Sequence, residues 1–125
     1  MARITTYKSR NRSRNKYGNR KVECDGFTFD SVKEMNRYCD LKYMLLAGEI
    51  SDLELQKEYE LQEAFIDKHG KRHRPIYYIA DFVYTDNKTG EKVIEDVKSK
   101  ATANDAVYRI KKKMMLYRGL EIVEV

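Results

Sequence analysis

The sequence predicts an α/β sandwich, in which a mixed central β-sheet is flanked by helices. Two stretches carry apolar residues at helical spacing, one between Ser31 and Gly48 and one between Thr102 and Tyr117. Four stretches have the composition of strands and lie between and after the helices, at residues 50–61, 77–84, 92–98 and 120–125. With 125 residues, the chain has the size of one domain with a single core.

The first elements are predicted to be a hairpin and a helix. Residues 22–29 resemble a β-hairpin, because Asp25-Gly26 is a dipeptide typical of its two-residue turn. Ser31 and Glu34 have the spacing of a capping box, so a helix is expected to begin there. Gly48 follows the last apolar residues of this helix and is well placed to end it.

A long strand and a basic loop are predicted next. Residues 50–61 alternate loosely between polar and apolar types, and residues 64–66 continue this strand or start another. Residues 67–74 form a loop rich in Lys, Arg and His. The segments 77–84 and 92–98 are two neighbouring strands, because a turn rich in Asp, Asn and Gly separates them.

The end of the chain is predicted to be a helix followed by a strand. The helix starts near residues 102–105, and residues 120–125 close the chain as a strand in which Ile122 and Val123 face opposite sides. The helix is expected to bury an apolar stripe that consists of Ala106, Val107, Ile110, Met114, Met115 and Tyr117.

The two central strands carry an acidic pattern. Side chains alternate along a strand, so Asp96 and Lys98 share one face while Glu95 takes the other. Asp81, on the neighbouring strand, is then expected to lie close to Asp96. Two carboxylates and one ammonium group can hold a hard divalent cation together with a water molecule.

This pattern resembles the PD-(D/E)XK nuclease superfamily, in which an Asp on one strand is followed by Asp/Glu-x-Lys on the next. The matching residues are Asp81, Asp96 and Lys98, and Ala80 stands where the name motif has Pro. The resemblance implies a restriction-endonuclease-like sandwich and a Mg²⁺ ion, or Mn²⁺, held by the two Asp residues and the carbonyl of Val97. It also implies that Lys98 positions the attacking water or stabilises charge on the phosphate.

The chain from about Gly18 to Val125 also resembles a family of small, mostly phage-encoded proteins of unassigned function, which implies a location in the host cytoplasm. The shared features are Phe29-Asp30-Ser31, Lys33-Glu34, Arg37-Tyr38, Gly48-Glu49-Ile50, Leu55-Gln56, Tyr78-Ile79-Ala80-Asp81-Phe82 and Glu95-Asp96-Val97-Lys98.

Two further site residues follow from these resemblances. Glu34 matches the Glu that the first helix of the superfamily contributes to the metal site, and the alternative is that it serves only the capping box. Gln56 matches a recurrent Gln of the phage family. It either orients Asp81 or a metal-bound water from a second layer around the metal, or is an ordinary strand residue.

Positive charge is concentrated at the N-terminus. Residues 1–22 contain eight Lys or Arg and no acid, and subtracting these eight from the net charge of +5 leaves −3 for the rest. Residues 1–21 are therefore interpreted as a basic flexible arm and residues 22–125 as the nuclease-like domain. The arm is expected to contact DNA phosphates through Arg10, Arg12, Arg14, Lys16 and Arg20. The alternatives are a solubilising tail and, less favoured, an anionic lipid surface.

Two other basic segments are DNA-binding candidates. Lys71, Arg72 and Arg74 belong to the basic loop, where Gly70 and Pro75 argue against a helical metal pair of His69 and His73. On the last helix, Lys111 or one of its basic neighbours is expected to face the site and touch phosphate, and a solvated charged face is the equal alternative.

Other compositional features exclude several protein classes. The chain has no apolar run near 18 residues and no apolar segment typical of a secretory signal, so neither a membrane span nor secretion is expected. Cys24 and Cys39 lack the spacing of a zinc site and fit reduced thiols of a cytoplasmic protein.

The leading interpretation is a Mg²⁺-dependent DNA endonuclease that is selective for DNA structure, with Holliday junction resolution as the specific expectation. Symmetric cutting of two strands would require a homodimer. One alternative is a nuclease-like DNA-binding protein that does not cut. The presence of all four residues argues against it: Glu34, Asp81, Asp96 and Lys98. Another is a sequence-specific restriction or homing-type nuclease, although no added recognition module is visible.

Overall fold

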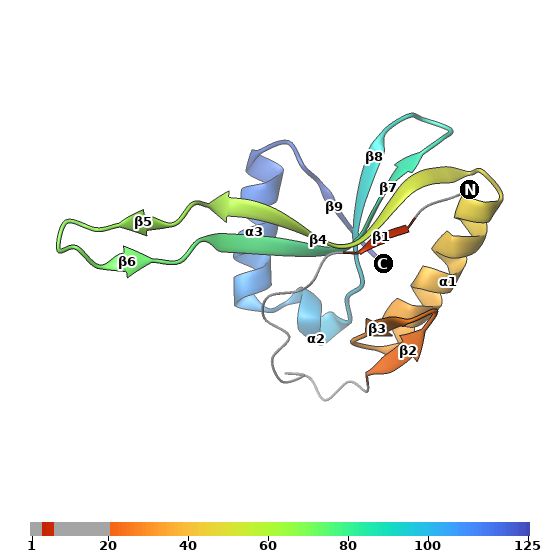
Figure 1. The fold of residues 1–125 in the computed structure, drawn as a ribbon, viewed down its shortest axis with the longest axis horizontal. Helices are drawn as coiled ribbons and strands as arrows, with labels where there is room; N and C mark the ends of the chain where they lie inside the picture. The colour runs from red at the N-terminus through yellow and green to blue at the C-terminus, as the bar shows by residue number, and fades with distance from the viewer. Residues whose placement is uncertain (1–3, 7–20) are drawn as a thin grey trace.

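The computed structural model describes residues 4–6 and 21–125 and shows an α/β fold built on a five-stranded mixed sheet (Figure 1). The strand order is β1-β4-β7-β8-β9. The strands are β1 Ile4–Thr6, β4 Ile50–Gln62, β7 Ile76–Asp86, β8 Lys92–Asp96 and β9 Ile122–Glu124. β7 is antiparallel to both β4 and β8, whereas β1 runs parallel to β4 and β9 parallel to β8. The predicted mixed sheet flanked by helices is confirmed.

The helices pack against opposite faces of this sheet. Helix α1, Val32–Leu46, contributes Tyr38, Leu41 and Leu45 to a cluster that also contains Phe82 of β7. Helix α3, Ala106–Tyr117, contributes Tyr108 and Met115 to a second cluster that contains Val83. Since neighbouring residues of a strand point to opposite faces, the two clusters form two layers of the core. A short helix, α2 Lys100–Ala103, precedes α3.

The predicted N-terminal hairpin is present as β2 Val22–Cys24 and β3 Phe27–Phe29. Its turn residues Asp25 and Gly26 both have positive φ angles, of 53° and 80°, as a type I′ turn requires. The hairpin packs on α1, because the rings of Phe27 and Phe29 lie 5.6 and 5.1 Å from the ring of Tyr38. The hairpin therefore packs in the same cluster that joins α1 to the sheet.

Both predicted ends of α1 are confirmed. The Ser31 side chain accepts a hydrogen bond of 3.1 Å from the Glu34 backbone N–H at the N-terminus. At the other end, Gly48 has a φ of 77° and its N–H donates to the carbonyl of Leu45. This left-handed residue turns the chain out of the helix and into β4.

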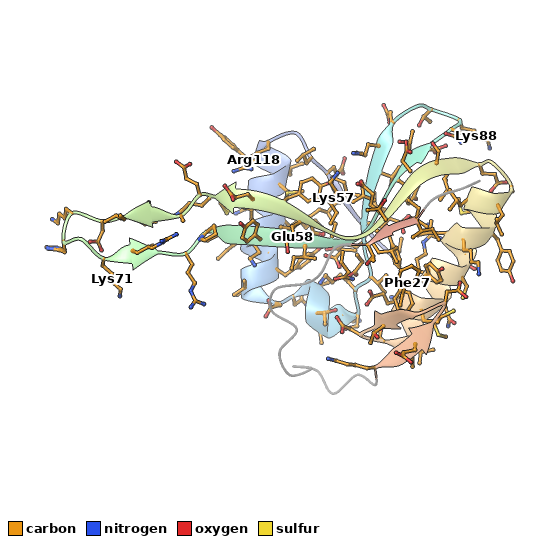
Figure 2. All side chains as sticks on the ribbon, in the orientation of Figure 1. Phe27, Lys57, Glu58, Lys71, Lys88 and Arg118 are labelled. Carbon is orange, nitrogen blue, oxygen red and sulfur yellow. The ribbon has the colours of Figure 1, made fainter. Side chains whose placement is uncertain are left out.

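The predicted basic loop is the turn of a projecting hairpin. Its strands are β5 Phe65–Ile66 and β6 Arg72–His73, and Figure 2 shows Lys71 near its tip, well beyond the body of the molecule. Asp67 organises the turn by accepting the N–H groups of His69 and Lys71. A helical pair of His69 and His73 is therefore absent, as the sequence indicated.

Two expectations need correction. The apolar stripe predicted on α3 is largely exposed: Val107, Ile110 and Tyr117 are 58%, 61% and 94% accessible. Of the predicted stripe only Met115 is fully buried, and Tyr108, which was not predicted, is buried with it, because the helix covers the sheet along one narrow line two turns long. Ile4–Thr6, within the predicted arm, form the edge strand β1. The sequence analysis missed this strand because three residues are too few to show a periodicity.

The sheet bends sharply where β4 and β7 pass the middle of the molecule (Figure 1). The bend lies between the paired residues Leu55–Phe82 and Lys57–Ala80, at Gln56 and Asp81. Gln56 has a φ of 57°, in the left-handed region that non-glycine residues rarely adopt in a strand. As a result, Ala80 packs in the α3 cluster, although regular alternation would place it on the same face as Phe82.

Helices long and apolar enough to cross a membrane are absent from the described part of the chain.

Candidate active site

The bend brings together four polar side chains from four different elements, namely Glu34 of α1, Gln56 of β4, Asp81 of β7 and Asp96 of β8. Gln56 of β4 is their link, because its Nε2 lies 3.1 Å from Oε1 of Glu34 on α1 and 3.4 Å from Oδ1 of Asp81 on β7. Its two amide hydrogens can therefore hold one oxygen of each carboxylate. The unusual backbone of Gln56 aims its side chain between them.

Asp81 lies at the centre of the group. The backbone N–H of Val97 donates to its Oδ2 at 2.8 Å. Its pKa is raised well above the usual value, first by burial and then by the negative charges of Asp96 and Glu34. A hydrogen bond with Asp96 adds to this shift. The three carboxyl groups are thus close enough to oppose one another's ionisation.

Asp96 ends β8 and is almost fully buried, with 4% of its surface accessible. Its Oδ2 accepts a hydrogen bond of 2.7 Å from the hydroxyl of Tyr78, and its Oδ1 lies 3.4 Å from Nζ of Lys98. Burial and the Asp96 charge raise the pKa of Tyr78, so this hydroxyl stays a donor. Asp96 is therefore held on both sides by groups that stabilise a carboxylate.

Glu34 serves the helix and the site at once. Its Oε2 accepts the backbone N–H of Asp30 at 3.3 Å, beside the cap made by Ser31. Its Oε1 accepts the amide of Gln56. Only the Ser31 half of the predicted capping box is formed, because the Glu34 side chain accepts the N–H of Asp30, one residue before the N-cap. The contact with Asp30 and the contact with Gln56 use different oxygens of the same carboxylate.

Lys98 lies two residues beyond the end of β8. Its backbone N–H donates to the Val125 carbonyl at 3.0 Å, and its own carbonyl accepts Nζ of Lys33 at 2.7 Å. Its side chain is 19% accessible, and Nζ lies 4.1 Å from the centre of the Tyr108 ring. The ammonium group therefore borders the carboxylates while keeping some contact with solvent.

Glu95 points to the opposite face of the sheet, as predicted. It accepts two hydrogen bonds from Arg37 of α1, at 2.8 Å to Nε and 2.6 Å to Nη2, and a third from the hydroxyl of Tyr84. This pairing raises the pKa of Arg37 above its ordinary value. It ties α1 to β8 next to Asp96, and so fixes the distance between the helix and the strand that carry the acids.

The carboxylates suit a hard divalent cation. Within residues 4–6 and 21–125 no three Asp, Glu, His or Cys side chains are gathered closely enough to hold a metal ion as they stand. Gln56 contacts both Glu34 and Asp81, and the pKa of Asp81 is raised by burial and by the negative charges of Asp96 and Glu34. Oxygen donors of this kind are those that Mg²⁺ and Mn²⁺ prefer, so the residues present fit such an ion.

The structure describes four of the nine predicted DNA-binding residues, and these four lie on the β5–β6 hairpin and on α3. Arg10, Arg12, Arg14, Lys16 and Arg20 are outside the described residues. Lys71, Arg72 and Arg74 are exposed on the β5–β6 hairpin that projects from the body (Figure 2). Lys111 is half-buried on α3, whereas its neighbour Lys112 pairs with Glu124 at 2.9 Å.

Tyr78 and Tyr108 are site residues that the sequence did not indicate. Regular alternation places Tyr78 on the face opposite Asp81, and only the bend lets its hydroxyl reach Asp96. Tyr108 lies within the predicted last helix, but the stripe expected there did not include it. Tyr78 belongs to a segment shared with the phage family, but that segment does not show that its hydroxyl reaches Asp96, and Tyr108 belongs to none of the shared segments.

A comparison with protein families gives one match, to the family described as "Protein of unknown function (DUF1064)", over residues 14–124. Neither the curated proteins nor the solved structures gave a match to the chain.

Proposed function

We propose that this chain, which belongs to the DUF1064 family, is a Mg²⁺-dependent DNA endonuclease of the PD-(D/E)XK type. The observation that carries the proposal is the meeting of three carboxylates and one ammonium group at the bend of the sheet. They come from α1, β7, β8 and the segment after β8. Their chain order and chemistry are those of the superfamily that the sequence resembles.

Asp81, Asp96 and Glu34 would hold the cation, for which Mn²⁺ is the second choice. When bound, such an ion polarises a phosphoryl oxygen and makes a water molecule more acidic. Oxygen ligands on α1, β7 and β8 would also draw the helix and the sheet together. The three carboxylates would then no longer oppose one another's ionisation.

The protein's own groups orient the acids and stabilise charge. Gln56 and the Val97 N–H fix the oxygens of Asp81, and the Tyr78 hydroxyl fixes Asp96. Lys98 brings a positive charge to the edge of the group, where it can steady the negative phosphate oxygens. In the hydrolysis the water oxygen would bond to phosphorus and the bond to the 3′ oxygen would break, and the leaving oxygen would take a proton from solvent, which leaves a 5′-phosphate and a 3′-hydroxyl. The proton of the water passes to solvent.

The proposed substrate is branched DNA, with a Holliday junction as the specific case. The basic arm and the projecting hairpin would contact phosphates, which position a protein on DNA without reading its bases. Symmetric cuts in two strands require two copies of the site, so we propose a homodimer. The setting would be phage recombination or DNA processing in the cytoplasm of the bacterial host.

The energetic cost of keeping these acidic residues favours a nuclease over a protein that only binds DNA. A partly buried carboxylate with a raised pKa, such as Asp81, destabilises the folded chain at neutral pH. A protein that only binds DNA gains nothing from this cost, because negative charge also repels phosphate.

The test is a cleavage assay on four-way junction, flap and linear duplex DNA, with Mg²⁺ or with a chelator. We expect the wild-type protein to cut the four-way junction only with the metal. Asp81→Ala and Asp96→Ala should abolish cleavage and bind DNA as well or better. The matched control is Asp40→Ala, at an exposed position on α1.

The outcomes separate the possibilities. Full activity in either site variant would refute the proposed site. Binding without any cleavage would favour the non-cutting alternative. Cleavage of linear duplex at one fixed sequence would favour a restriction or homing-type nuclease.

A further inference from the structure

We propose that Tyr108 of α3 is a positioning residue that holds the ammonium group of Lys98 at the acidic site. The inference rests on the proposed function of Lys98 and adds a residue to it from an element that carries none of the other site groups. Three features of the structure support it: the weak hold on the Lys98 side chain, the ring beside it, and the anchoring of that ring.

The Lys98 side chain needs a second support. Its backbone is fixed by hydrogen bonds to Val125 and from Lys33, but four rotatable bonds separate that backbone from Nζ. Its distance to Asp96 is 3.4 Å, which is longer than an ordinary N–H···O hydrogen bond. The ion pair with Asp96 alone would leave the ammonium group free to move towards solvent.

The ring of Tyr108 provides that support. Nζ of Lys98 lies 4.1 Å from the ring centre, well within the range at which the face of an aromatic ring attracts a cation. Asp96 lies near the same ammonium group. The carboxylate and the ring together restrict Nζ to the edge of the acidic group.

The ring is itself anchored at both ends. The Tyr108 hydroxyl donates to Oε2 of Glu124 on β9 at 2.6 Å, and its backbone N–H donates to the helix cap Asp105. Lys112 also pairs with Glu124. Burial, followed by the hydrogen bond to Glu124, raises the pKa of Tyr108, so the ring stays neutral and the hydroxyl stays a donor. The position of Lys98 is thus set by how α3 docks on β9.

The first measurement is spectroscopic and does not depend on cleavage. A proton above an aromatic ring is shifted upfield, so the ε-methylene protons of Lys98 should resonate upfield of those of exposed lysines. The signal is assigned by its disappearance in Lys98→Ala. It should stay upfield in Tyr108→Phe, which keeps the ring, and move to the position of exposed lysines in Tyr108→Leu.

The second measurement is the rate of cleavage. Tyr108→Leu should lower kcat on the order of tenfold with little change in KM, because it removes the attraction between the ring and the partly buried ammonium group. Tyr108→Phe should recover most of that activity. In a Lys98→Ala background, Tyr108→Leu should have no further effect, since both changes act through one group. Tyr117→Leu, at an exposed position on the same helix, is the matched control.

The two measurements fail independently. A wild-type protein that cuts none of the DNA substrates would refute the proposed function, and the spectrum would still decide whether Tyr108 holds Lys98. A Lys98 signal at the position of exposed lysines in the wild-type protein would overturn the inference. Equal effects of Tyr108→Leu with and without Lys98 would overturn it too. If Tyr108→Leu does not fold, the wild-type and Tyr108→Phe spectra decide.

Discussion

Glu34 divides its two carboxylate oxygens between the start of α1 and the acidic site. One oxygen accepts the N–H of Asp30, and the other accepts the amide of Gln56. A side chain that is already held by the Asp30 N–H reaches the site with little rotamer freedom left to lose. The contact with Asp30 therefore helps to preorganise Glu34 for the site.

Glu34→Gln separates these two roles. Gln can also serve at this position of a capping box, so we expect stability within about 1 kcal/mol of wild type. The side chain of Gln is neutral and has one oxygen where Glu has two, so cleavage should fall by on the order of a hundredfold or more. Ser31→Ala is the converse control, because it should cost about 1 kcal/mol through removal of the cap and leave cleavage largely intact. Thermal melting and the cleavage assay on the same preparations check both, and near-normal cleavage by Glu34→Gln would make its role purely structural.

Asp81 lowers the stability of the fold at neutral pH and serves the proposed metal site. Its raised pKa means that ionising it costs more in the folded chain than in the unfolded chain. We expect Asp81→Asn to be more stable than the wild type by about 1 kcal/mol in a chelator at neutral pH, because the amide is neutral and still accepts the Val97 N–H. Mg²⁺ should raise the melting temperature of the wild type but not of the variant. A less stable variant in the chelator would contradict this account of Asp81.

At the scale of elements, α1 is positioned by contacts on two sides. Arg37 joins it to Glu95 of β8, and Tyr38 and Lys42 join it to Asp25 in the turn of the β2–β3 hairpin. The hydrogen bond from Lys42, followed by that from Tyr38, lowers the pKa of Asp25 below its usual value. The hairpin thus stabilises the helix that carries Glu34.

Acid should weaken this attachment. A carboxyl group with a lowered folded pKa stabilises the fold above its ordinary pKa, and this stabilisation disappears as pH falls through the lowered value. Asp25→Asn keeps the left-handed turn, since Asn tolerates positive φ. We expect its stability to fall less than that of the wild type between roughly pH 5 and pH 2. Denaturant unfolding at several pH values measures this, and Lys42→Met should show the same reduced slope. If the stability of both variants falls with decreasing pH as steeply as that of the wild type, the contact does not couple to folding.

At the scale of the whole molecule, the acidic group and the basic hairpin belong to different parts of the fold. The acids lie at the bend of the sheet, whereas Lys71, Arg72 and Arg74 lie on the projecting hairpin (Figure 2). The five basic candidates between Arg10 and Arg20 lie outside the described residues. Deleting residues 1–21 would also remove β1 from the edge of the sheet. Substitution is therefore a cleaner way than truncation to test the arm.

Replacing the five basic residues Arg10, Arg12, Arg14, Lys16 and Arg20 by Gln should weaken DNA binding at every sequence. The slope of log affinity against log salt should become shallower by roughly 0.9 for each duplex phosphate that the arm no longer neutralises. Selectivity for DNA structure should remain, because phosphate contacts do not read bases. Binding titrations at several salt concentrations measure this, with Lys88→Gln in the β7–β8 turn as a control. A slope equal to the wild-type slope would leave the arm as a solubilising tail.

The sequence by itself determined the elements and the acidic pattern. Asp25-Gly26, the Ser31 cap and Gly48 are local signals, because they depend on dihedral angles and on hydrogen bonds to near neighbours. The phase of Asp96, Lys98 and Glu95 also follows from local alternation along one strand. Each of these features depends on interactions between residues that are close together in the sequence, so it can be predicted without knowledge of the fold.

Only the tertiary structure decided how these elements meet. Gln56 has a left-handed backbone, and the sheet bends at Asp81. These two features let the hydroxyl of Tyr78 reach Asp96, although regular alternation would place Tyr78 on the opposite face of the sheet. Packing of α3 buried Tyr108 together with Met115 and left most of the predicted apolar stripe exposed, and pairing with β4 made a strand of Ile4–Thr6. Such contacts join residues that are distant in sequence, and their free energy comes from burial and pairing that no local pattern encodes.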